Sequence, residues 1–82
     1  MTKLLPLKTI QAPGRAPAGL AWDGQNVWIN DYQTGVLDRL DPITGEKKAS
    51  LLCPGVISGL AWDGHSLWQS RMDEDWLEQI NQ

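Results

Sequence analysis

The hexapeptide GLAWDG stands at residues 19–24 of this chain and again at residues 59–64. The match extends over residues 19–28 and 59–68, where GLAWDG and a final Trp make seven of ten positions identical. The two copies are 40 residues apart (59 − 19), a period typical of propellers and solenoids, in which each repeat is one supersecondary unit. The internal repeat therefore decides the fold more than any local pattern does.

The rest of both copies aligns on nearly the same frame. Two further pairs of segments match in their apolar positions: 36–41 with 76–81, and, after one gap, 9–14 with 50–55. We therefore interpret residues 1–82 as a single domain, with a first repeat at about 4–47 and a second at about 48–82.

Each repeat predicts four short antiparallel strands and essentially no helix, because no apolar period near 3.6 residues is sustained. The Asp-Gly pair that ends each hexapeptide is a strong hairpin signal. The expected strands are residues 4–12, 19–23, 26–30 and 36–41 in the first copy, and 48–53, 59–63, 66–70 and 76–81 in the second. Four antiparallel strands in about 40 residues make one propeller blade, so the sequence predicts an all-β chain of two four-stranded blades.

The pattern GLAWDG-x-x-Val/Leu-Trp is followed by an apolar strand and by Asp-Pro-x-Thr-Gly at residues 41–45. It resembles the repeats of the YVTN, NHL and streptogramin-lyase-like groups of bacterial β-propellers, over about 75 residues of the chain. The resemblance implies the blade fold, and these groups differ in activity. Streptogramin-lyase-like enzymes use a histidine base with a metal. The single histidine here, His65, is expected in a hairpin opposite the channel mouth, so that activity is not carried over.

Two blades cannot form a closed propeller, which needs about four to eight. Along the chain, each repeat supplies an outer, an inner, a second and a third strand of a blade, and an outer strand pairs with a third strand. Residues 4–12, the first outer strand, then have no third strand to pair with, and residues 77–81, in the last third strand, have no outer strand. Head-to-tail pairing of these segments between subunits satisfies both edges and closes a ring. We predict a homotrimer with six blades; a tetramer with eight blades, and a fragment of a larger propeller, are the alternatives.

Composition excludes several classes of protein. Hydrophobic residues make up 41% of the chain and charged residues 21%, as in a globular domain. Seven basic against ten acidic residues argue against nucleic acid and anionic membranes as partners. A single cysteine and no cluster with metal-ligand spacing predict no disulfide, metal or cofactor. No apolar run of membrane-spanning length and no signal-peptide core is present, which predicts a cytoplasmic protein.

The two repeats differ most where DYQTGV, at residues 31–36, is aligned with RMDEDW, at residues 71–76. These loops are expected at the channel mouth, where propellers generally bind ligands. The predicted binding residues there are Arg15, Asp31, Tyr32, Arg71, Asp73 and Trp76. Four of them have a second interpretation. Asp73 would belong to a solvated acidic loop, Trp76 would pack at the contact between subunits, and Tyr32 and Arg71 would pair with neighbouring loops. The four repeated tryptophans, Trp22, Trp28, Trp62 and Trp68, are expected in the core between blades.

The predicted function is a homo-oligomeric module that binds a small ligand, a glycan or a protein at the channel mouth. A lyase- or hydrolase-like enzyme using the carboxylates of Asp31 and Asp73 is one alternative, and a structural unit without a dedicated ligand is another. We predict no catalytic residue, because His65 is isolated and Cys53 is expected to be a small buried apolar residue.

Overall fold

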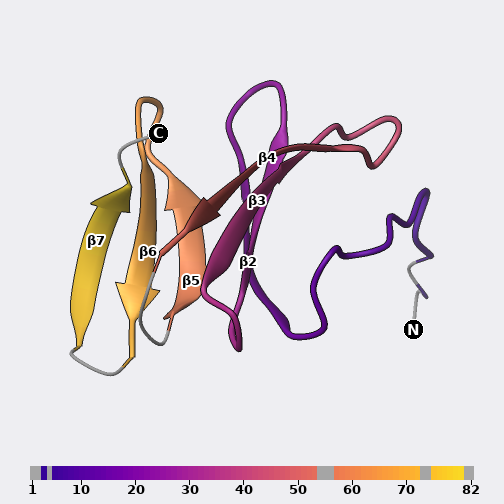
Figure 1. Cartoon of the computed structure of the whole chain (residues 1–82). Coiled ribbons are helices and arrows are strands. Elements are labelled where there is room, and N and C mark those ends of the chain that lie inside the picture. The colour runs from indigo at the N-terminus through magenta and orange to yellow at the C-terminus, as the bar shows by residue number, and fades with distance from the viewer. Residues whose placement is uncertain (1–2, 4, 54–56, 73–74, 81–82) are drawn as a thin grey trace.

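Seven antiparallel strands form the regular structure of the chain in a computed structural model (Figure 1), which describes residues 3, 5–53, 57–72 and 75–80. The all-β prediction is confirmed, since no helix occurs in these residues, and the strand bounds differ from the expected ones by at most two residues. The strands are β1 (Pro17–Trp22), β2 (Val27–Asp31), β3 (Val36–Leu40), β4 (Lys47–Leu52), β5 (Ile57–Trp62), β6 (Leu67–Arg71) and β7 (Trp76–Ile80).

The strands form two sheets that do not coincide with the two repeats. Sheet A has the order β1-β2-β3-β4, and sheet B has the order β5-β6-β7. β4 opens the second repeat in sequence, yet it pairs with β3 of the first repeat, Val36 opposite Leu52 and Arg39 opposite Ala49. Sheet A is thereby completed by the following repeat, while sheet B has three strands in the described part of the chain, with β7 at its edge.

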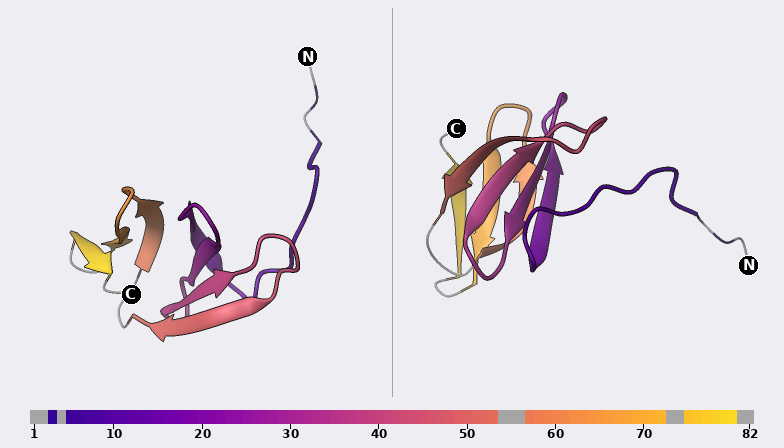
Figure 2. Two further views of the ribbon diagram at one scale, coloured as in Figure 1. Left: turned by 90° about the horizontal axis from the view of Figure 1, so that it is seen from above. Right: turned by 45° about the vertical axis from the view of Figure 1, so that its right-hand side comes forward.

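The strand expected over residues 4–12 is absent from the structure. Residues 5–12 belong to no strand, and Leu4 lies outside the described residues. This segment is largely exposed. Its part nearer the N-terminus extends away from the sheets (Figure 2), while Ile10 and Ala12 line a groove on sheet A. A strand needs a partner edge for its backbone hydrogen bonds, and β7, the counterpart of β3 that has no further strand beside it in the described part of the chain, belongs to the other sheet. The prediction of eight strands within one chain was therefore wrong for the chain alone.

Polar turns connect the strands through hydrogen bonds to aspartate. After β3, Oδ1 of Asp41 accepts from the backbone N–H groups of Ile43 at 2.7 Å and Thr44 at 3.0 Å. Gly45 then takes a positive φ of 76°, which glycine adopts without strain. Asp-Pro-x-Thr-Gly thus encodes a complete turn, as short-range side-chain to backbone bonding predicts for Asp in this position.

The core lies between the sheets, where β1 packs beside β5 (Figure 2). Its buried members are Ala21, Trp28, Leu37 and Leu67, and partly buried apolar side chains of Leu51, Cys53, Leu60, Trp62 and Ile80 pack around them. The described residues contain no helix long and apolar enough to cross a membrane.

Truncation of a core leucine tests this packing. The side chain of Leu37 is fully buried, and Leu37→Ala is expected to lower the free energy of unfolding by about 2–5 kcal/mol through the cavity it leaves. Ile43→Ala, in the exposed β3–β4 turn, is the matched control and should change it by less than about 0.5 kcal/mol. Urea unfolding measures both; equal effects would contradict the position of the core.

Candidate functional site

The loops that precede β1 and follow β2 are joined at one end of sheet A. The backbone N–H of Tyr32 donates to the carbonyl of Ala16 at 2.8 Å, and the N–H of Ala16 donates to Oδ2 of Asp31 at 3.0 Å. Among the predicted binding residues, Arg15, Asp31 and Tyr32 therefore lie on neighbouring loops. Arg15 and Tyr32 are exposed, and Asp31 is buried.

The carboxylate of Asp31 is engaged in holding these loops together. Its Oδ1 accepts from the backbone of Gln33 at 3.0 Å and of Thr34 at 2.9 Å, and from the Thr34 hydroxyl at 3.1 Å. The hydrogen bond from the Ala16 N–H and those from Thr34 and Gln33 lower the pKa of Asp31. A Cβ on Gly14 would overlap this carboxylate, so the loop can cross it only at a glycine. Asp31 thus organises the loops rather than presenting a free carboxylate.

Sequence reasoning missed this role, although a signal for it was present. Residues 31–35 read DYQTG and residues 41–45 read DPITG, and both form the same Asp-x-x-Thr-Gly turn. In each, the glycine N–H donates to the carbonyl of the aspartate four residues earlier, at 3.0 and 2.8 Å. The sequence pattern at residues 31–36 was interpreted only as part of a binding loop, although it shares this turn motif with residues 41–45.

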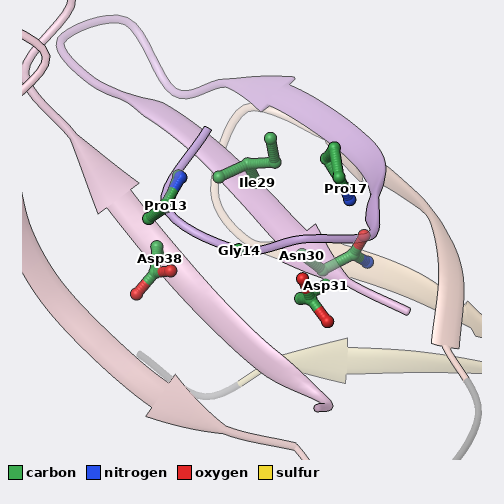
Figure 3. Close-up of a pocket in the computed structure, with 7 residues that line it drawn as sticks. All are labelled: Pro13, Gly14, Pro17, Ile29, Asn30, Asp31 and Asp38. Atoms are coloured by element: carbon green, nitrogen blue, oxygen red, sulfur yellow. The ribbon is translucent and has the colours of Figure 1, made fainter. Parts of the chain in front are cut away.

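The cavity beside these loops is too small for a ligand (Figure 3). It has a volume of about 10 Å³, enough for at most one water molecule. Its lining residues are Pro13, Gly14, Pro17, Ile29, Asn30, Asp31 and Asp38. Asp38 is also buried, and it accepts a hydrogen bond from the Ser50 hydroxyl. Any ligand at this end must therefore bind to exposed side chains.

Two further predicted binding residues, Arg71 and Trp76, lie on sheet B. Arg71 and Trp76 are cross-strand neighbours at the ends of β6 and β7. The Arg71 guanidinium carbon is 5.9 Å from the centre of the Trp76 ring, and Nε is 3.7 Å from Oε1 of Glu78. This geometry is that of a cation–π contact supported by an ion pair. Trp76 remains 56% exposed, and Asp73 lies outside the described residues.

A larger candidate surface covers the side of sheet B that faces away from sheet A. On sheet A, the face turned toward sheet B carries Gly19, Ala21, Trp28 and Leu37, all buried. At an offset of 40, sheet B carries the same four residue types, Gly59, Ala61, Trp68 and Leu77, and all are exposed. We call this set the far face of sheet B.

The difference in exposure between the matched positions is large. Leu37 is 0% exposed and Leu77 is 75% exposed; Trp28 is 2% exposed and Trp68 is 36% exposed. The far face of sheet B therefore matches the core face of sheet A at these positions, but no second sheet of the described chain covers it. Contiguous exposed apolar side chains of this kind mark interaction surfaces.

The opposite side of the molecule carries the matching surface. On sheet B, the side chains that pack onto the core are Leu60, Trp62, Leu67 and Ile80. At the offset of 40, their counterparts are Leu20, Trp22, Val27 and Leu40, which we call the outer face of sheet A. Leu20 and Trp22 are exposed, and Leu20, Val27 and Leu40 line a groove there. Of the four repeated tryptophans, which were expected in the core between blades, Trp28 and Trp62 lie in the core of the chain, whereas Trp22 and Trp68 lie on faces that sheets A and B leave uncovered.

The N-terminal segment occupies part of the groove on the outer face of sheet A. Ile10 and Ala12 line it, and the repeat alignment with its one gap matches them to Leu51 and Cys53. Leu51 and Cys53 pack against the core between the two sheets. Ile10 and Ala12 therefore lie against the outer face of sheet A, as Leu51 and Cys53 lie against the core between the sheets. Lys8 Nζ donates to the Pro42 carbonyl at 3.0 Å and holds the segment there.

A hydrogen-bonded clamp orients Trp68 on the far face of sheet B. Oδ2 of Asp63 accepts from the Trp68 indole N–H at 2.8 Å, and Oδ1 accepts from the backbone of His65 and Ser66 at 2.8 Å each. Asp23 holds Trp28 by the same bonds. The bonds from Ser66, Trp68 and His65 lower the pKa of Asp63 to about 2. Trp68 is therefore held in the orientation of its buried counterpart although nothing covers it.

No protein-family model matches the chain, and no curated protein matches it significantly. Within the described ranges, no three His, Cys, Asp or Glu side chains are grouped so as to hold a metal ion. Burial raises the pKa of the Cys53 thiol, which keeps it protonated and unreactive at neutral pH. The surfaces that remain are the two uncovered sheet faces and the Arg71–Trp76 pair.

The pH dependence of stability tests the clamp. Because the folded state holds the pKa of Asp63 at about 2, below that of an unfolded aspartate near 3.9, the ionised carboxylate stabilises the fold above about pH 4. That stabilisation is lost as the pH falls from about 4 to 2. Carboxyl titration by NMR should give the low pKa, and Asp63→Asn should flatten this part of the stability curve. A pKa near 3.9 would contradict the clamp.

Proposed function

We propose that the chain is the subunit of a homo-oligomeric β-propeller that works as a binding module. The observation that carries the proposal is the far face of sheet B, which carries the same residue types as the core face of sheet A at four matched positions. Sheet B covers this surface on sheet A. We expect the matching surface on sheet B to be covered by another sheet as well. A second copy of the chain supplies the matching cover through the outer face of its sheet A.

Assembly of this kind is head to tail. The far face of sheet B in one copy meets the outer face of sheet A in the next, so two different surfaces of the chain are used. Such heterologous contacts generate a closed ring when the rotation from each subunit to the next brings the last subunit back into contact with the first. Because each copy contributes two sheets, three copies give six blades and four give eight, both within the range of known propellers.

The edge of sheet B supports the same arrangement. β7 is an edge strand with a free row of backbone groups, and such edges recruit further strands. In sheet A, β4 fills the corresponding place beside β3. The segment that matches β4 in the repeat is residues 6–11, which pairs with no strand in its own chain. Residues 6–11 of the next copy would complete sheet B by pairing with β7.

The ring would present the predicted binding residues several times around one axis. Trp76 offers more than half of its surface, and Arg71 stacks near its ring. A sugar or another flat apolar ligand can stack on such an indole, while the exposed Tyr32 and Arg15 supply polar contacts. Repetition adds avidity to a weak single contact. Asp31 contributes by fixing the loops that carry Arg15 and Tyr32.

Light scattering during gel filtration tests the assembly. The chain is expected to elute at about three times its monomer mass, and its thermal stability should rise with protein concentration. Deletion of residues 1–11 should reduce the mass, because it removes the strand that completes sheet B. Ile43→Ala, in a turn outside the proposed contacts, should leave the mass unchanged. A folded monomer at micromolar concentration would refute the ring.

Binding is tested on a glycan array with the oligomeric wild-type protein. Against a glycan that binds, Trp76→Ala should lower affinity by up to about tenfold, the effect of losing one aromatic stacking contact, while the oligomer persists. Met72→Ala, an exposed residue next to Arg71, is the control and should bind as wild type does. If Trp76→Ala dissociates the oligomer instead, Trp76 is a seam residue and the stacking site is wrong.

A further inference from the structure

Gly19 is required by a close approach between the two sheets. Its φ is not positive, so the backbone conformation alone does not call for glycine. A Cβ at this position would lie 2.5 Å from the carbonyl oxygen of Ser58 and 2.7 Å from the backbone nitrogen of Leu60. Both are backbone atoms of β5, which cannot rotate away. Any side chain at position 19 would therefore push β1 and β5 apart.

Gly59 occupies the same position in the second repeat, and the single chain gives no reason for a glycine there. Its φ is not positive. The nearest atom to a Cβ would be Oγ of Ser70 at 3.5 Å, an ordinary van der Waals distance. Glycine weakens a strand interior compared with alanine, and it often marks a place where another backbone comes close. Among the described residues, no strand of another sheet comes within 4 Å of the place where a Cβ on Gly59 would lie.

We infer that β1 of a second copy packs against β5 at Gly59, with its backbone at Ala18 and Leu20 in the place that Ser58 and Leu60 occupy beside Gly19. This contact joins the inner strands of neighbouring copies. It rests on the proposed propeller assembly and adds to the β7 edge a second point at which the copies meet, on β5.

The side chains around Gly59 fit this partner. In the seam between sheets A and B within the chain, Trp28 packs within a core that includes Leu67 and, at its margin, Leu60 and Ile80. In the inferred seam, Trp68 takes the place of Trp28, and the residues that meet it are Leu20, Val27 and Leu40 of the next copy. The clamp from Asp63 already holds the Trp68 indole in the required orientation. The contact therefore needs no rearrangement of the side chain that contributes most apolar area.

The polar residues of the two seams also agree with this partner. Inside the chain, Nδ2 of Asn30 donates to Oε1 of Gln69 at 3.3 Å across the seam, and both residues are buried. The repeat matches Asn30 to Ser70 and Gln69 to Ile29. Oγ of Ser70 accepts from the Gly59 N–H at 2.9 Å within its own sheet. Ile29 can therefore cover Ser70 without leaving an amide buried and unpaired.

A pair of variants that block opposite sides of the seam tests the contact. Gly59→Ala fits the single chain, and its methyl group should collide with the backbone of the next copy. Leu20→Lys places a charge on the outer face of sheet A, where Leu20 is 64% exposed in the single chain. Each variant alone should raise the concentration for half-assembly at least about tenfold, measured by light scattering. His65→Ala, in an exposed hairpin, should assemble as wild type does.

Mixing the two variants gives the decisive measurement. One seam in the mixture is undamaged, between sheet B of the Leu20→Lys chain and sheet A of the Gly59→Ala chain. A 1:1 mixture should therefore form a heterodimer in native mass spectrometry, even where each variant alone is monomeric or unfolded. A mixture that stays monomeric, or a Gly59→Ala chain that assembles normally, would overturn the contact. A wild-type chain that is itself monomeric would refute the proposed propeller as a whole.

Discussion

The close approach of β1 to β5 at Gly19 is the contact on which the rest of the structure depends. It brings the face of sheet A that carries Trp28 and Leu37 against sheet B, and it creates the only extensive core in the described residues. A domain of this size buries a modest share of its surface, and large apolar side chains of both sheets, among them Leu20, Trp22 and Leu77, are exposed. The uncovered faces follow directly from stacking two sheets of this kind.

Much of the fold follows from short-range signals in the sequence. The Asp-Gly hairpins and the Asp-Pro-x-Thr-Gly turn fix where chain reversals occur, so seven of the expected strands form close to their expected bounds. The eighth does not form, since residues 5–12 belong to no strand. A repeat pattern identifies matched positions, but it does not say which of them the fold covers. Trp28 and Trp62 pack in the core, whereas their counterparts Trp68 and Trp22 are exposed.

The candidate site was less accessible to sequence reasoning. The role of Asp31 followed from a turn motif that also occurs at residues 41–45, so comparison of the two segments would have revealed it. The contact between Arg71 and Trp76 depends on the register of β6 and β7, which the sequence leaves open until the hairpin is paired. The difference between Gly19 and Gly59 is visible only in three dimensions, since the two residues stand in identical hexapeptides.

The pairing of β4 with β3 has a consequence for how the chain folds during synthesis. Sheet A is closed by a strand that belongs to the next repeat, so it stays one strand short until residue 52 has left the ribosome. The first forty residues then present an open edge and two apolar faces to the surrounding solution. Ordered structure is expected to appear late and over both repeats together, and a single repeat cut from the chain would lack a strand that it needs. The four strands that fold together as sheet A therefore begin and end one strand later in the chain than the four strands of the first repeat in the sequence.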